Sequence, residues 1–221
     1  MKALRPLTLR IPLACTLAAL LLAGCSILDS KQTDPVTIYS PQIKVAPDPA
    51  WPSVTWSLVI AKPSAARVVD SPRISVRPAP GELQVYKGAS WAQPATDLLQ
   101  DAVQRVLEDS GRIAAVSSAD AGILGDYRLV LDVRRFESDY AGQATPSATI
   151  EVSAKLVQQR SQRVVASRTF LQAEPAGSTE VPQVAAAFET ALTRITHDLA
   201  GWTLQQGQAD ASRQPAPPLR R

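Results

Sequence analysis

The sequence has very little histidine and cysteine. Its 221 residues include one histidine, His197, and two cysteines, both within the first 25 residues. Catalytic triads and zinc sites need several such side chains that meet in the fold. The chain also lacks the G-x-x-x-x-G-K-[ST], G-x-G-x-x-G and G-x-S-x-G motifs of nucleotide-binding proteins and hydrolases. We therefore predict no catalytic, cofactor-binding or metal-binding residues, and we expect that the protein is not an enzyme.

Long apolar runs are also scarce, and the one that occurs lies at the N-terminus. The stretch 11–23 is almost wholly apolar and follows a positively charged start, but it is shorter than the roughly 20 residues that a membrane-spanning helix needs. Leu22, Ala23 and Gly24 come directly before Cys25. This order is typical of a bacterial lipoprotein export signal, in which the signal peptidase recognises these three residues and Cys25 carries the lipid.

The excess of positive charge is confined to the predicted signal. The chain has 23 lysines and arginines against 20 aspartates and glutamates, and three of the positive residues, Lys2, Arg5 and Arg10, precede Cys25. The mature side chains are therefore balanced at 20 of each sign, so the sequence pI of about 9.0 gives no support for nucleic-acid binding. With Cys15 removed and Cys25 acylated, the mature protein is expected to have no disulfide.

Acyl chains on Cys25 would hold the protein on a membrane without crossing it. Two or three chains anchor stably, since each buried CH₂ contributes roughly 0.8 kcal/mol, whereas one chain binds only marginally. Ser26 follows the cysteine, where an aspartate commonly signals retention in the inner membrane of enteric bacteria. We therefore expect anchoring in the outer membrane, with the protein facing the periplasm.

Composition divides the chain into four parts. Residues 1–24 are the export signal, and residues 25–53 are predicted as a lipidated, proline-rich tether that reaches roughly 80 Å at about 3.1 Å per residue. A short apolar patch at 36–39 alternatively docks as an edge strand and shortens that reach. Residues 54–206 have the length of one domain, and residues 207–221, with little apolar content, are predicted as a disordered tail.

The predicted domain alternates between two hydrophobic periods. Residues 127–133 and 148–156 place apolar side chains at every second position, as in strands with one buried face. Residues 95–107 and 181–202 instead carry apolar side chains at helical spacing. The prediction is an α+β two-layer sandwich, a mainly antiparallel sheet with two amphipathic helices packed on one face. Further strands are expected at 56–61, 73–77, 82–86, 112–116 and 163–171.

A few side chains are candidates for contact with a partner. Trp91 precedes the first helix, and tryptophan is enriched in interface hot spots, so partner contact and core packing are both open for it. Trp202 lies on the apolar stripe of the last helix, which favours core packing. The charged run at 134–139 is interpreted as a charged strand end or as a binding rim. Asp97 and Asp101, one helical turn apart, are interpreted as part of a solvated helix face.

Several short segments occur in a recognisable order between residues 58 and 202. They are Arg-Ile-Ser-Val-Arg at 73–77, Ser-Trp-Ala-Gln-Pro at 90–94, Leu-Leu at 98–99, Asp-Tyr-Arg-Leu at 126–129 and the following Phe136. In this order, and combined with the lipoprotein signal, they resemble the ABC-type transport auxiliary lipoproteins. Val76 is a departure, because the family often has tyrosine there.

The resemblance implies a non-catalytic role in a lipid transport system built around MCE-domain proteins. In such systems an inner-membrane permease and ATPase move hydrophobic molecules through periplasmic proteins. The lipoprotein would dock this machinery at the outer membrane, with an MCE-domain protein as its partner. The alternative, favoured by the long tether, is a lipoprotein that regulates a cell-wall synthase. A third hypothesis, direct carriage of lipid, would need an apolar cavity. A homo-oligomer is also open, because exposed sheet edges can pair with a second copy of the chain.

Overall fold

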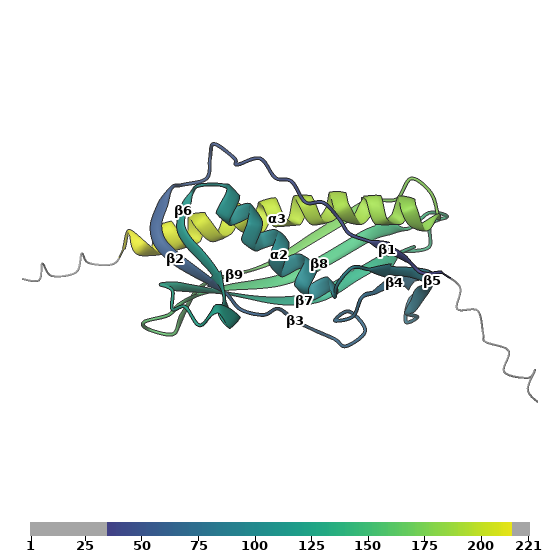
Figure 1. Cartoon of the computed structure of the whole chain (residues 1–221), viewed down its shortest axis with the longest axis horizontal. Coiled ribbons are helices and arrows are strands. Elements are labelled where there is room, and N and C mark those ends of the chain that lie inside the picture. Colours follow the sequence, from purple (N-terminus) through teal and green to yellow (C-terminus); the bar gives the residue numbers. More distant parts are fainter. Residues whose placement is uncertain (1–34, 214–221) are drawn as a thin grey trace, which may run out of the picture. The chain divides into compact units, whose positions relative to one another are not determined.

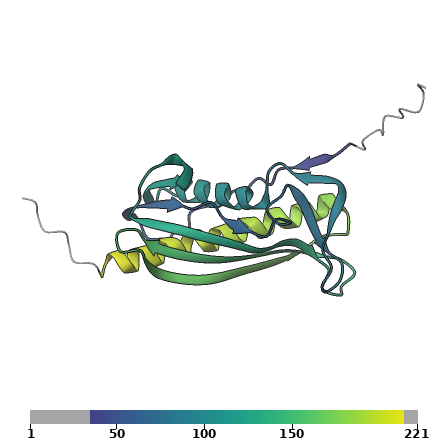
Figure 2. The same ribbon diagram turned by 90° about the horizontal axis from the view of Figure 1, so that it is seen from below.

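The computed structural model describes residues 35–213, which form a curled sheet of nine strands with two helices (Figure 1). The longer helix lies along the long strands, and the shorter helix lies beside it (Figure 2). The strands are β1 (Thr37–Tyr39), β2 (Val54–Ile60), β3 (Ser64–Ala65), β4 (Arg73–Arg77), β5 (Gln84–Trp91), β6 (Ile113–Ser118), β7 (Tyr127–Asp139), β8 (Ser147–Gln158) and β9 (Arg163–Pro175); the helices are α2 (Ala95–Asp109), the 3-10 turn η2 (Ala119–Ala121) and α3 (Val181–Ala211).

The fold is α+β, but the sheet is mixed, so the predicted mainly antiparallel sheet is wrong. On one edge β7 pairs antiparallel with β8, which pairs in the same way with β9. On its other edge β7 pairs in parallel with the short strands β2, β3 and β4 in turn. Parallel pairing also joins β2 to β6 and β1 to β5. Apolar alternation shows which face of a strand is buried but not the direction of its neighbour, and this explains the error.

The long strands β7 and β8 supply the floor of the core. Leu129 of β7 lies opposite Leu156 of β8, and both side chains are fully buried. A β-bulge between Val133 and Arg135 then shifts the register by one residue, which brings Phe136 onto the buried face. The alternation in the sequence therefore stops at Val133, although the strand continues.

Helix α3 is longer than its apolar periodicity predicts. The pattern extends to residue 202, but the helix continues to Ala211. Its last turns are packed on the sheet, because the buried Asp210 accepts hydrogen bonds from the Tyr127 hydroxyl at 3.1 Å and from Arg163 at 2.6 Å. The first five residues of the predicted tail, 207–211, therefore belong to the domain.

Much of the predicted tether also lies on the domain. The pairing of β1 with β5 confirms the alternative in which the patch at 36–39 docks as an edge strand. From there residues 40–53, called the strap below, run along α3 to the start of β2 (Figure 1). Ile43 and Val45 of the strap pack partly buried against the core, and Trp51 is buried.

Candidate functional site

The residues with the most specific sequence signal lie outside the described part of the chain. Leu22, Ala23, Gly24 and Cys25 precede residue 35, so export and lipid attachment stay predictions. Across residues 35–213, no helix has both the length and the apolar content that crossing a bilayer requires.

Trp91 lies in the core and not on the surface. It is 2% exposed, and its ring meets Phe136 and Phe188 edge-on at centroid distances of 5.9 and 5.1 Å. Such aromatic pairs contribute about 0.5–1.5 kcal/mol beyond their burial. Of the two interpretations left open by the sequence, the structure realises core packing. Trp202 is buried as well, edge-on to Phe170 at 5.7 Å.

His197 and the acidic residues of α2 do not form a reactive cluster. Asp101 accepts a hydrogen bond from the Gln93 amide at 3.0 Å on the exposed side of α2. His197 Nε2 lies 3.6 Å from the Asp48 carboxylate, and its Nδ1 lies 3.2 Å from Asp198. In the part of the chain that the structure describes, no three histidine, cysteine, aspartate or glutamate side chains are grouped to hold a metal ion.

The charged run at the end of β7 has an exposed part and a buried part. Arg134 is about half exposed, and its ion-pair distances are long, at 3.5 and 3.7 Å. Glu137 is 2% exposed, and Arg77 of β4 donates to its two carboxylate oxygens at 2.8 and 2.9 Å. Arg135 donates to Glu137 at 2.8 Å and to Asp139 at 2.5 Å. The buried carboxylate thus has two guanidinium partners.

These contacts make the buried part of the run a structural link between β4 and β7. Burial alone raises the pKa of Glu137, but the hydrogen bonds from Arg77 and Arg135 outweigh it and hold that pKa below its usual range. The hydrogen bond to Glu137 is also the main cause that raises the pKa of Arg77. Because these charges satisfy one another, a charged strand end describes them better than a binding rim.

The strap is fastened to α3 at a few points. Near its start, the Gln42 backbone N–H donates to Glu189 at 3.0 Å. Near its end, the indole of Trp51 covers Gly201 so closely that a Cβ there would lie 2.6 Å from the indole Nε1. The Trp51 ring also lies 5.1 Å from the His197 ring. Trp51 is 3% exposed and is therefore the main apolar contact that holds the strap.

A second contact between tryptophan and glycine lies further along α3. Trp56 of β2 packs over Gly207, where a Cβ would come within 2.3 Å of the Trp56 Cζ2 atom. The Trp56 ring also meets Tyr127 edge-on at 4.9 Å. Sequence reasoning missed both contacts. The available signal was Gly201 inside the predicted helix, where glycine costs about 1 kcal/mol relative to alanine, whereas Gly207 fell in the predicted tail and gave no signal.

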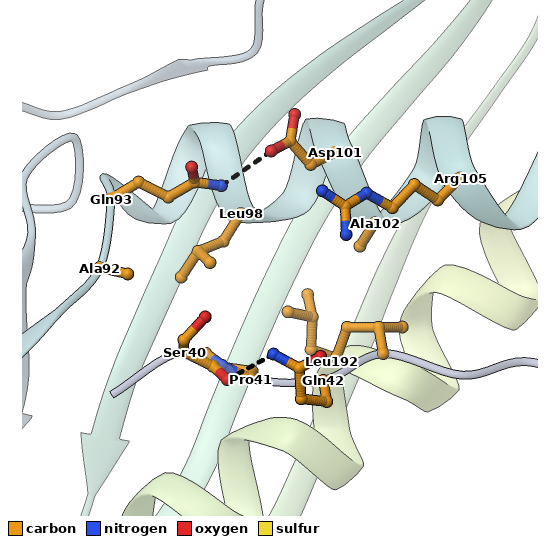
Figure 3. Close-up of a pocket in the computed structure, with 11 residues that line it drawn as sticks. Ser40, Pro41, Gln42, Ala92, Gln93, Leu98, Asp101, Ala102, Arg105 and Leu192 are labelled. Atoms are coloured by element: carbon orange, nitrogen blue, oxygen red, sulfur yellow. Dashed lines mark hydrogen bonds between the residues drawn. The ribbon is translucent and has the colours of Figure 1, made fainter. Parts of the chain in front are cut away.

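A small cavity lies where the strap passes between α2 and α3 (Figure 3). Its volume is about 160 Å³, and Leu98 and Leu192 reach it from the two helices. Asp101 and Arg105 border it from α2, Ala92 and Gln93 line it just before that helix, and strap residues 40–43 form another wall. Small-molecule sites usually measure about 300–1,000 Å³. This cavity therefore gives little support to direct lipid carriage.

Two exposed aliphatic side chains stand at the end of the domain opposite β1. Ile123 and Leu124 are 60% and 90% exposed. They lie in residues 122–126, called the distal loop, which lead into β7 at Tyr127. β1 lies instead towards the other end of β7, because it pairs with β5 beside β4, and β4 pairs with residues 137–139 of β7 (Figure 1). The 13 residues of β7 separate the two ends by about 40 Å at about 3.3 Å per residue.

The base of the distal loop is fixed against β2. The Asp126 carboxylate accepts hydrogen bonds from the backbone N–H and the hydroxyl of Ser57, both at 2.8 Å, and the Asp126 N–H donates to the Ser57 carbonyl at 3.1 Å. A Cβ at Gly125 would lie 3.0 Å from Cγ2 of Val59, so the chain passes close to that strand. Between the loop and the β8–β9 turn lies an open depression of about 610 Å³, whose lining is Leu124, Gly125, Asp126, Gln158, Gln159, Arg160 and Gln162.

The described domain has the α+β fold of several solved structures. Protein XCC0632 from Xanthomonas campestris is 62% identical, with a TM-score of 0.77 over 80% of this chain and 99% of that chain. An uncharacterized protein of 12% identity has a TM-score of 0.59 over 75% of this chain and 97% of its own, and this likeness shows the fold alone.

The chain belongs to the family described as ABC-type transport auxiliary lipoprotein component, whose model matches residues 37–200. This match confirms the resemblance drawn from the sequence. It begins at the first residue of β1, so the family domain includes the strap. Uncharacterized protein bll6063 of Bradyrhizobium diazoefficiens is 30% identical over 157 residues, which are 71% of this chain and 41% of that protein. The chain thus spans about two fifths of the length of this relative.

Proposed function

We propose that the protein is a non-catalytic auxiliary component of an MCE-type ABC lipid transport system. Acyl groups on Cys25 anchor it in the outer membrane, and the domain faces the periplasm, where it docks an MCE-domain protein. The observation that carries the proposal is the family match over residues 37–200, in a chain for which the sequence predicts a lipoprotein signal at residues 1–24. Transport auxiliaries act through partners, so the function is assigned to a surface and not to a catalytic centre.

The length of free tether supports docking close to the anchoring membrane. Because β1 pairs with β5 and the strap is fastened to α3, residues 26–35 alone separate Cys25 from the described domain. Fully extended, that stretch reaches about 35–40 Å, compared with the roughly 80 Å expected for a tether that runs to residue 53. A short tether keeps the domain at a high effective concentration near partners that approach the same membrane.

The same geometry weakens the alternative role as a regulator of a cell-wall synthase. That interpretation was favoured by a long tether able to reach through the cell wall, and docking of the strap shortens this tether. Self-association stays a prediction as well. Strand β9 pairs with β8 alone among the described strands, so its other edge is available to a second chain.

A crosslinking pull-down from intact cells tests the proposal. The tagged full-length protein is compared with Cys25→Ala, which removes the acylated thiol, and with Cys15→Ala, a matched change within the predicted signal. We expect an MCE-domain protein to be recovered with the unchanged chain and with Cys15→Ala, and to be lost with Cys25→Ala. Recovery of a cell-wall synthase in its place would favour the alternative, and recovery of no MCE-domain protein would contradict the proposal.

A further inference from the structure

The distal loop holds two adjacent aliphatic side chains in water. Single exposed aliphatic residues are common on protein surfaces and need no partner. Ile123 and Leu124 differ because they are neighbours, they are 60% and 90% exposed, and they stand in the short connection between the 3-10 turn η2 and β7. A chain that only had to link η2 to β7 could use polar residues at both positions.

The backbone that carries these side chains is held by hydrogen bonds on the side of β7. Gly122, at φ +68°, ends the 3-10 turn in a left-handed conformation that suits glycine. On the other side, Asp126 is held to Ser57 through its carboxylate and its N–H, and its carbonyl accepts from the Gln159 N–H at 2.8 Å. A fixed backbone loses little conformational freedom on binding, which is a property of preorganised interaction sites.

The surroundings of the pair match the rim of a protein interface. The neighbouring depression is bordered by the amides of Gln158, Gln159 and Gln162 and by one charge of each sign, Asp126 and Arg160. Protein interfaces commonly have an apolar centre with a polar rim. Binding to an anionic membrane surface instead uses clusters of several lysines and arginines. The charge around the loop therefore favours a protein over a lipid headgroup surface.

The position of the pair fits a partner that approaches from the side away from the anchor. The chain outside the structure between Cys25 and residue 36 ends at β1, and it reaches about 35–40 Å at most. The distal loop lies at the opposite end of β7, a strand of 13 residues that spans about 40 Å. When the domain stands away from the membrane, Ile123 and Leu124 are at its far end.

We propose that Ile123 and Leu124 are a docking knob that inserts into an apolar pocket, bordered by neutral polar groups, on a periplasmic protein of the transport system. This inference rests on the proposed function and names the surface that performs it. The two side chains fill the partner's pocket, and the glutamine-lined depression beside them receives the rim of that pocket.

The test uses the full-length, lipidated protein in intact cells. Ile123→Ser with Leu124→Ser removes the knob. Val164→Ser with Leu171→Ser is the matched control, because those β9 side chains are 51% and 57% exposed and lie outside the distal loop. Both variants change exposed positions, so equal thermal unfolding midpoints are expected. A photocrosslinking residue at position 124, and in a separate chain at position 171, reports which molecule touches each place.

The expected result is that the MCE-domain protein crosslinks from position 124, and that its recovery falls about 30-fold in the knob variant but less than about twofold in the control. Undiminished recovery with the knob variant would overturn the inference while leaving the proposed function intact. Crosslinks from position 124 to lipid alone, or to a second copy of this chain alone, would overturn it too. If the unchanged chain recovers no MCE-domain protein, the proposed function fails. In that case the knob is overturned as well, because its partner is proposed to be a protein of that system.

Discussion

The floor of the core and the strap are held on the domain in different ways. Along β7 and β8 a whole face is removed from water, with fully buried side chains such as Leu129 and Ile150 in successive inward positions. The strap buries one large side chain, Trp51, while Ile43 and Val45 are partly covered. Apolar burial contributes roughly 25 cal/mol per Å², so the two regions differ greatly in the free energy that holds them.

This difference predicts two levels of stability in one domain. The floor opens only when the whole domain unfolds, because its contacts span strands and α3 together. The strap can leave its place by losing its own contacts, while the sheet and helices stay folded. Local opening of this kind is expected where few apolar contacts tie a segment down. Substitutions in the floor should therefore lower the free energy of global unfolding, whereas substitutions at the strap should mainly change its local opening.

The largest effect is expected in the aromatic cluster above the floor. Phe188 is fully buried, stacks on Phe136 at 5.0 Å and meets Trp91 edge-on at 5.1 Å. Phe188→Ala leaves a cavity between α3 and the sheet. This change should lower the free energy of unfolding by about 3–5 kcal/mol. Urea unfolding of the purified protein measures it. A loss below about 1 kcal/mol would mean that this cluster does not belong to the part of the domain that opens only in global unfolding.

A smaller loss is expected at the ionic link between β4 and β7. Glu137→Gln removes the charge that binds Arg77 and Arg135. Breaking a buried pair costs about 3–5 kcal/mol, but the two arginines are partly exposed and rehydrate, so we expect about 2 kcal/mol at neutral pH. Arg134→Ala, which breaks exposed ion pairs on the same strand, is the control and should cost less than about 0.5 kcal/mol.

The dependence of stability on pH provides a second test of the contacts of Glu137. The folded-state pKa of Glu137 lies below its usual value, so the unfolded chain binds the proton more readily. The stability from this group is therefore fully present above an unfolded pKa of about 4.3 and is lost as pH falls through the folded pKa. Thermal unfolding midpoints between about pH 6 and pH 2 should fall more steeply for the unchanged protein than for Glu137→Gln. Parallel curves would contradict the assigned hydrogen bonds.

The sequence predicts the buried faces of the long strands better than it predicts strand direction, bulges and the end of α3. Alternation along β8 predicts its buried face correctly, because a strand with one buried face has apolar residues at every second position. The bulge before Phe136 and the parallel partners of β7 leave no such mark, since both depend on neighbours distant in the chain. The sequence places Asp210 in a polar tail, but in the structure it is a buried hydrogen-bond acceptor at the end of α3.

The candidate surface shows the same division between local and distant information. The lipoprotein signal at Cys25 is a continuous motif and can be found from the sequence alone. Ile123 and Leu124 look like an ordinary apolar pair beside a strand. Their exposure becomes apparent only once Asp126 is seen tied to Ser57 of β2, far away in the chain. Trp91 illustrates the opposite case, because a side chain typical of interfaces lies in the core.

A moderate effect is expected at the contact between β2 and α3. Gly207→Ala places a Cβ 2.3 Å from the ring of Trp56, which must then move. Overpacking costs about 1–3 kcal/mol, and the better helix propensity of alanine returns about 1 kcal/mol, so a net loss of about 1 kcal/mol is expected in urea unfolding. In a Trp56→Leu background the same substitution should become neutral or stabilising. An unchanged loss in that background would show that the Trp56 ring is not the cause.

The smallest effect on global stability, and the sharpest test of the two levels, is expected at Gly201. Gly201→Ala puts a Cβ 2.6 Å from the Trp51 indole and should release the strap from α3. The loss in global unfolding free energy cannot exceed what docking of the strap contributes, and the gain of about 1 kcal/mol in helix propensity offsets it. We expect a net change below about 1 kcal/mol, with amide hydrogen exchange in residues 40–50 accelerated at least about tenfold.

Trp51→Ala removes the same contact from the strap side without touching the helix, so both variants should accelerate exchange in the same residues. Exchange in β7 and β8 should stay slow in each, because the floor does not depend on the strap. If either variant accelerates exchange across the floor as well, the strap and the core form one cooperative unit. If neither accelerates exchange in the strap, its other contacts, such as the bond from Gln42 to Glu189, hold it without Trp51. The first result would remove the distinction between the two regions, and the second would move the attachment point of the strap towards β1.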